Sequence, residues 1–137
     1  MEFKREITIN CDKNGLWDLV KDYKKRSEFW HGTRSIEKMD NFYYVQFAFP
    51  GKGKMSMEIN DNDYTMREDY LKGPFTGYIT TKIEDNGKIR LISEWNIKLS
   101  PSLKLFTKKL QGHFETGTED ALNRIKNYLE GTSNVKS

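Results

Sequence analysis

Residues 100–131 read SPSLKLFTKKLQGHFETGTEDALNRIKNYLEG, and this stretch decides the fold. Ser100 can cap a helix, Pro101 suits the first helical position, and Gly131 suits the position just past a helix end. Apolar residues recur every three or four positions, which keeps one face of the helix apolar. A helix of about thirty residues is about 45 Å long, so this face needs a broad surface to pack on. The apolar residues are Leu103, Phe106, Leu110, Phe114, Ala121, Leu122, Ile125, Tyr128 and Leu129.

The apolar face has a gap in its middle, where Gly117 and Thr118 stand in place of a large residue. Glycine inside a helix costs about 1 kcal/mol relative to alanine, so the small size of Gly112 and Gly117 requires a reason. One reason is close packing of the helix on a sheet. The other is that the helix covers a cavity, and its small side chains leave that space open. The sequence leaves both readings open.

The composition indicates one folded domain. A chain of 137 residues is long enough to bury a core, and aromatic residues make up 13%, which is too many for a disordered chain. The 23 basic and 20 acidic residues give a net charge of only +3, which does not predict a nucleic-acid partner. We expect a single domain over residues 1–131 and a flexible tail over residues 132–137.

The sequence predicts neither a metal site nor a cofactor. Its single cysteine, Cys11, follows a predicted strand and is typical of a small buried residue rather than a nucleophile, and no Cys/His cluster accompanies it. Neither a G-x-G-x-x-G fingerprint nor a P-loop is present. No apolar run approaches 18 residues and the N-terminus has no signal-peptide core, so the expected location is the cytoplasm.

The rest of the chain predicts an antiparallel sheet. Residues 2–10 alternate as a half-buried strand, with Arg5 on the apolar face. Asp12 then caps a short helix, and a second helical turn over residues 23–30 ends before Gly32. About six strands joined by tight turns follow, with the strongest hairpin signal at Asn86-Gly87. This order predicts an α+β fold in which the long final helix covers the sheet. The predicted strands span 34–39, 42–49, 54–60, 64–71, 75–83 and 89–99.

This order of elements resembles the START-like helix-grip superfamily. The sequence DKNGLWDLVKDY at residues 12–23 resembles the first-helix pattern of that superfamily, and residues 89–95 are similar to its last strand. His31-Gly32 stands where many members have Pro-Gly. The superfamily includes lipid-transfer START domains, pollen-allergen-type carriers, polyketide cyclases and coenzyme-Q-binding proteins. The resemblance implies a curved seven-stranded sheet wrapped around the C-terminal helix, with a hydrophobic cavity between them and no shared catalytic motif.

The inward faces of the later strands and the helix are expected to form the cavity wall, although an ordinary core would have the same pattern. Ligand pockets are mostly apolar with a few polar groups, so these residues favour a carrier or sensor of a small hydrophobic ligand, without catalysis. The expected wall residues are Tyr44, Met55, Met57, Met66, Tyr70, Phe75, Ile79, Trp95, Phe106, Leu110, Phe114 and Gly117.

An enzyme of the polyketide cyclase or hydrolase kind is the second hypothesis. Glu68 lies on an apolar strand face and His113 borders the buried face of the helix, so the two could act as a general acid and base. The simpler reading places Glu68 and Arg5 near strand ends facing water. A protein-interaction module is the third hypothesis; it would show an exposed apolar patch away from the cavity.

Basic residues could gather at one end of the molecule and contact anionic lipid headgroups at a membrane surface, although a solvated surface explains them equally. These residues are Lys21, Lys24, Lys25, Arg26, Lys52, Lys54, Lys104, Lys108 and Lys109.

Overall fold

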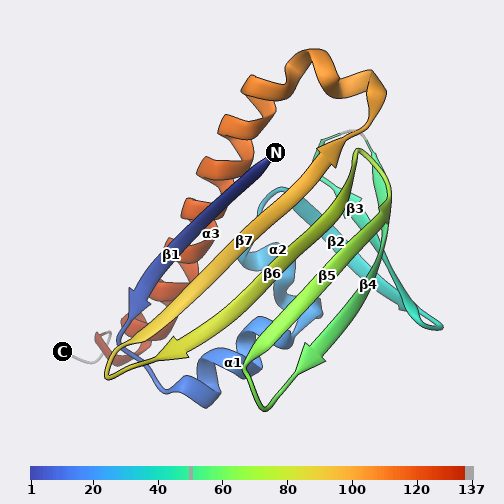
Figure 1. Ribbon diagram of the computed structural model, residues 1–137. Helices are drawn as coiled ribbons and strands as arrows, with labels where there is room; N and C mark the ends of the chain where they lie inside the picture. Colours follow the sequence, from blue (N-terminus) through green and yellow to red (C-terminus); the bar gives the residue numbers. More distant parts are fainter. Residues whose placement is uncertain (50, 135–137) are drawn as a thin grey trace.

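The computed structural model describes residues 1–49 and 51–134 and consists of one curved sheet with helices on one side (Figure 1). The elements are, in order, β1 (Glu2–Ile9), α1 (Lys13–Lys21), the 3-10 turn η1 (Tyr23–Lys25), α2 (Arg26–Phe29), β2 (Thr33–Met39), β3 (Phe42–Phe47), β4 (Lys52–Asn60), β5 (Thr65–Lys72), β6 (Phe75–Asp85), β7 (Ile89–Leu99), the 3-10 turn η2 (Pro101–Phe106) and α3 (Thr107–Asn134).

The seven strands form one antiparallel sheet in the order β1-β7-β6-β5-β4-β3-β2. Each strand from β2 to β7 pairs with its neighbour in sequence, and β1 closes the sheet against β7. The long helix α3 runs along the β1 side, with α1 and α2 beside it on the same face of the sheet (Figure 1). This confirms the predicted α+β fold with a long C-terminal helix and short helices after the first strand.

The local signals at the first helix act as predicted. The Asp12 side chain accepts a hydrogen bond from the Gly15 amide at 2.8 Å and so caps α1. Leu16, Trp17 and Val20 lie on the buried face of that helix. The alternation of β1 is also confirmed, because Ile9 is buried and Arg5 is half-buried on the same face.

The predicted helix over residues 100–131 is wrong at both ends. Residues 101–106 form the 3-10 turn η2, and the α-helix begins only at Thr107. The Ser100 side chain makes no capping bond, and its Oγ lies 3.2 Å from Ser102 Oγ. Gly131 lies inside α3, which continues to Asn134, because a single glycine costs a helix only about 1 kcal/mol relative to alanine. Residues 135–137 of the predicted tail lie outside the described residues.

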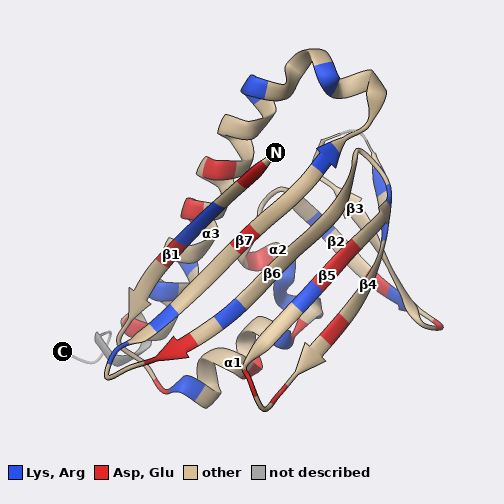
Figure 2. Cartoon of the chain, in the orientation of Figure 1, with Lys and Arg blue, Asp and Glu red and all other residues tan. Residues whose placement is uncertain are grey.

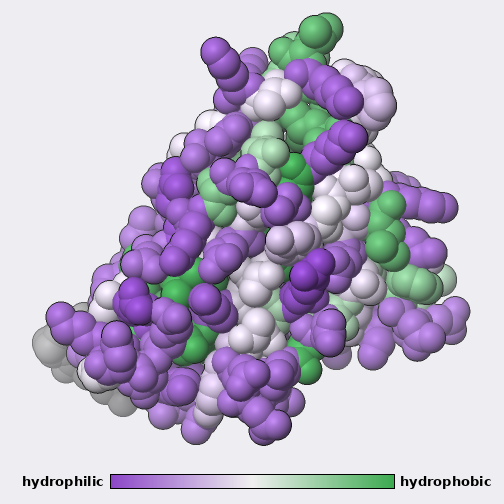
Figure 3. Space-filling view, in the orientation of Figure 1, coloured by the Kyte–Doolittle hydropathy of each residue, from purple (hydrophilic) through white to green (hydrophobic). Residues whose placement is uncertain are grey.

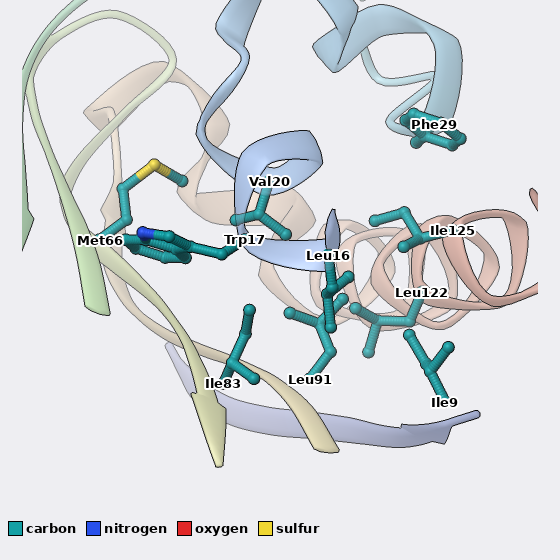
Figure 4. Packing of buried hydrophobic residues seen from close by; sticks show 10 residues of the cluster. All are labelled: Ile9, Leu16, Trp17, Val20, Phe29, Met66, Ile83, Leu91, Leu122 and Ile125. Atoms are coloured by element: carbon teal, nitrogen blue, oxygen red, sulfur yellow. The ribbon is translucent and has the colours of Figure 1, made fainter. Parts of the chain in front are cut away.

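Two apolar clusters form the core. The first joins α1 and α2 to the lower part of α3, which is the C-terminal half of that helix, and includes Leu16, Leu91 and Leu122 (Figure 4). The second is rich in aromatic rings and includes Phe75 and Trp95. Trp30 and Met57 pack against both clusters, so the two clusters meet at these residues.

Candidate functional site

A cavity of about 120 Å³ lies where the two clusters meet, between the sheet and α3. Residues from the α1–α2 segment, from strands β2, β3, β5, β6 and β7, and from α3 line it. Its lining includes the exposed residues His31, Gly32, His113 and Gly117, so the cavity reaches the surface between the α2–β2 connection and α3.

Most of the expected wall residues line this cavity. Period-two alternation places side chains two apart in β5 on the face toward α3. Aromatic rings from β6, β7 and α3 meet in the wall: the ring centroids of Phe75 and Trp95 lie 6.1 Å apart, and those of Trp95 and Phe114 lie 5.5 Å apart. The expected residues that line the cavity are Met66, Tyr70, Phe75, Ile79, Trp95, Phe114 and Gly117. Whether they bind a ligand stays a prediction.

Five expected wall residues lie elsewhere. Tyr44 is 41% exposed on the outer face of β3, because Val45 takes the inward position. Phe106 is 52% exposed, because it belongs to η2 rather than to the buried part of the helix. Met55 is fully buried in the second cluster, whereas Met57 and Leu110 are partly buried against the core and do not line the cavity.

Gly117 lines the cavity, and its environment bears on the two readings of the gap in α3. A Cβ added at Gly117 would meet no heavy atom within 4 Å, so close packing on the sheet does not require glycine there. Thr118, next to it, is fully buried and also lines the cavity. The exposed Gly117 therefore leaves α3 without a side chain at the mouth of the cavity, and that the ligand uses this space stays a prediction. Gly112 also has open space around it, but it does not line the cavity.

A buried ion pair forms part of the wall. Arg26 Nη1 donates to Glu68 Oε2 at 2.6 Å, and the two side chains are only 10% and 3% exposed. The simpler expectation, that Glu68 faces water near a strand end, is wrong because the alternation of β5 turns it to the buried face. Sequence reasoning missed Arg26 as a wall residue and grouped it with surface cations. Burial acts to lower the pKa of Arg26, but the neighbouring Glu68 carboxylate outweighs it and raises that pKa.

Tyr70 continues the polar part of the wall, two residues after Glu68 on the same face of β5. Burial raises the pKa of its hydroxyl, and the Glu68 charge raises it further, so the phenol stays protonated and uncharged. Thr81, on β6, is a further buried hydroxyl in the lining. The cavity thus combines an apolar, aromatic wall with one polar group of residues.

Both catalytic candidates line the cavity. Glu68 is deep in the wall, whereas His113 is exposed at the mouth. No hydrogen bond joins them among the described residues, and Glu68 is engaged by Arg26 instead. Within residues 1–49 and 51–134, no group of three His, Cys, Asp or Glu residues could hold a metal ion. Cys11 is half-buried, and burial raises the pKa of its thiol, which lowers its reactivity.

No family model and no curated protein matches the sequence. Solved structures do match the fold. A conserved protein from Geobacillus kaustophilus covers 96% of this chain and 97% of its own, with a TM-score of 0.80 and 11% identity. An aromatase/cyclase from a Streptomyces species matches over 95% of this chain and 93% of its own chain, with a TM-score of 0.73 and 10% identity. A START superfamily protein from Mycobacterium smegmatis matches over 90% of this chain and 98% of its own chain, with a TM-score of 0.63 and 10% identity.

These likenesses, together with the seven-stranded sheet and its long terminal helix, define the class. The chain has the START-like helix-grip fold, as its order of elements predicted. Identities this low establish the fold and not the activity. No helix in the described part of the chain is long and apolar enough to cross a bilayer.

Proposed function

We propose that this protein binds a small, mainly apolar ligand in the cavity beneath α3. The observation that carries the proposal is that Gly117 leaves open space in α3 at a cavity whose wall is rich in aromatic side chains. A helical glycine without a packing reason lowers stability, and a ligand that needs the space explains its presence. Apolar walls with a few polar groups are the usual setting of a small-molecule site.

The volume of the cavity limits the size of the ligand. At about 120 Å³ the cavity is close to an engineered apolar cavity of about 150 Å³ that holds benzene. The enclosed part of the ligand is therefore about the size of one ring. A lipid with two acyl chains does not fit this volume.

Native mass spectrometry of freshly purified protein, followed by organic extraction, tests the proposal. Gly117→Leu and Gly112→Leu form a matched pair, since each removes a helical glycine into open space but only the first adds a side chain to the cavity wall. We expect the wild type and Gly112→Leu to carry the same small apolar adduct and Gly117→Leu to lose it. Equal adducts in all three proteins would place the ligand elsewhere.

A cyclase- or hydrolase-type enzyme is the second candidate, favoured by the presence of both Glu68 and His113 in the cavity lining. A carrier would release the same molecule from the wild type and from His113→Ala. An enzyme would accumulate substrate in the variant and product in the wild type. Extracted molecules that differ in mass between the two proteins would therefore favour catalysis.

A further inference from the structure

Arg26 presents a buried hydrogen-bond donor that the protein does not satisfy. Its Nη1 is bound to Glu68, but its Nη2 is buried and has no acceptor among the described residues. Arg26 is one of the residues that line the cavity. Buried donors on charged groups are almost always paired, because leaving one unpaired is costly.

The charge balance around Arg26 indicates which acceptor suits it. Glu68 already neutralises the guanidinium, and both side chains are buried. A ligand carboxylate would bring a second negative charge next to Glu68, away from water. An uncharged oxygen accepts the same hydrogen bond without that repulsion. The uncharged Tyr70 hydroxyl, on the same strand face, adds a second donor beside it.

We propose that Arg26 Nη2 is the polar anchor of the cavity, and that the ligand is an uncharged, ring-sized apolar molecule with an acceptor oxygen such as a ketone carbonyl. This inference rests on the proposed function, since it assigns the ligand class of the same cavity. It also assigns a binding role to the Arg26–Glu68 pair, since the cost of removing two charges from water offsets the stability that a buried ion pair contributes.

Three one-ring probes test the anchor: acetophenone, α-methylstyrene and benzoate. α-Methylstyrene replaces the carbonyl oxygen of acetophenone with a methylene group at almost the same shape, and benzoate carries the negative charge. A purely apolar cavity prefers the hydrocarbon, because water solvates the ketone better. We expect NMR titration of the backbone amides to show acetophenone binding at least tenfold more tightly than either other probe.

The outcomes separate this inference from the proposed function. Hydrocarbon binding equal to or tighter than that of the ketone would overturn the anchor and leave the apolar cavity site standing. Tightest binding of benzoate would overturn the uncharged class. Failure of all three probes to bind would overturn the small-ligand site itself.

The double variant Arg26→Met/Glu68→Met supplies the matched control, because it removes both charges together and leaves no unpaired ion. We expect it to bind α-methylstyrene at least as tightly as the wild type and to lose the preference for acetophenone. A preference for the ketone that survives in this variant would overturn the role of Arg26. The comparison of probes on the wild type decides the question even where the variant fails to fold.

A different surface carries a second inference. Leu105 is 95% exposed and Phe106 is 52% exposed at the end of η2, although both are large apolar residues. The space-filling view shows hydrophobic surface at this tip of the molecule (Figure 3). No acidic residue occurs between Glu94 and Glu115, whereas four lysines do (Figure 2). These exposed lysines are Lys98, Lys104, Lys108 and Lys109.

We propose that this tip, residues 98–109, docks on the surface of an anionic lipid bilayer. Exposed apolar side chains enter the boundary between headgroups and acyl chains, and flanking lysines attract anionic headgroups. The tip leads directly into the part of α3 that carries His113 and Phe114 at the cavity. Docking would therefore bring the cavity mouth close to the membrane, where small apolar molecules concentrate.

Vesicle flotation tests the docking surface, with vesicles of phosphatidylcholine alone or mixed equally with phosphatidylglycerol. We expect binding to the anionic vesicles at low salt, weaker binding at high salt, and at least a tenfold loss in Leu105→Asn/Phe106→Asn. Met39→Asn/Ile59→Asn is the control, because it removes two other exposed apolar residues, 58% and 40% exposed, on β2 and β4. Equal binding of both double variants, or of both vesicle types, would overturn the proposal, as would no binding at all.

Discussion

Tyr70 packs in the cavity wall, where its ring centroid lies 4.9 Å from that of Phe75. Burial, followed by the neighbouring Glu68 charge, raises the pKa of its hydroxyl above the ordinary value of 10.0. Above pH 10 the unfolded chain therefore loses a proton that the folded chain keeps. Ionisation then favours the unfolded state, so the Tyr70 contribution to stability is complete below pH 10 and is lost as the pH rises.

Tyr70→Phe should accordingly flatten the alkaline limb of the stability profile. Between pH 10 and about pH 12, the free energy of unfolding of the wild type should fall more steeply than that of the variant, by up to about 1.4 kcal/mol per pH unit. Urea unfolding followed by tryptophan fluorescence measures this slope. Tyr44→Phe, at an exposed tyrosine, should keep the wild-type slope. The same slope in all three proteins would contradict the assigned burial.

Single residues also mark how far the sequence could predict the site. The alternation of β5 predicts that Glu68 shares a face with Met66 and Tyr70, and the structure confirms it. The partner of Glu68 was not predictable, because 23 basic residues are available and only the packing of α2 against the sheet selects Arg26. Tyr44 was misplaced since β3 is apolar on both faces, which leaves its orientation undetermined by hydropathy.

At the scale of elements, the hairpin turns made the sheet predictable. Turn residues between β-prone runs predict antiparallel neighbours, and the register confirms each hairpin from β2 to β7. The pairing of β1 with β7 joins residues far apart in the sequence. The resemblance to the helix-grip superfamily implied a seven-stranded sheet, but no local signal predicted which strand β1 pairs with.

The long helix shows what periodicity leaves undetermined. Apolar residues repeat at helical spacing on both sides of Gly117, yet the buried ones, Ala121, Leu122 and Ile125, all follow it in the sequence. Leu105 and Phe106 are also apolar, but they are exposed because no facing surface in the described part of the chain covers them. A sequence pattern indicates which face of a helix is apolar, but tertiary structure decides how far the facing surface extends.

At the scale of the whole molecule, α3 is held to the sheet unevenly. Its lower half is fixed by buried apolar residues and by Lys126 Nζ, which donates to the Thr8 carbonyl at 2.8 Å. Its middle is held by Arg5, which bonds Glu115 at 2.9 Å and Glu119 at 3.0 Å. Toward the N-terminal end of α3, residues 107–109 and 112–113 are exposed. Between residues 107 and 113, only Leu110 packs against the core.

This uneven attachment predicts that α3 opens from its upper end. Local opening free energies follow the buried contacts that must break, so amides of residues 108–112 should exchange with deuterium at least about 100-fold faster than those of residues 121–125. Because Gly117 and His113 lie between these segments at the cavity, acetophenone should slow exchange around them and leave the lower half unchanged. Hydrogen exchange followed by mass spectrometry measures both effects. Uniform protection along α3 would mean that the helix opens as one unit, and ligand entry would then require release of its buried lower half.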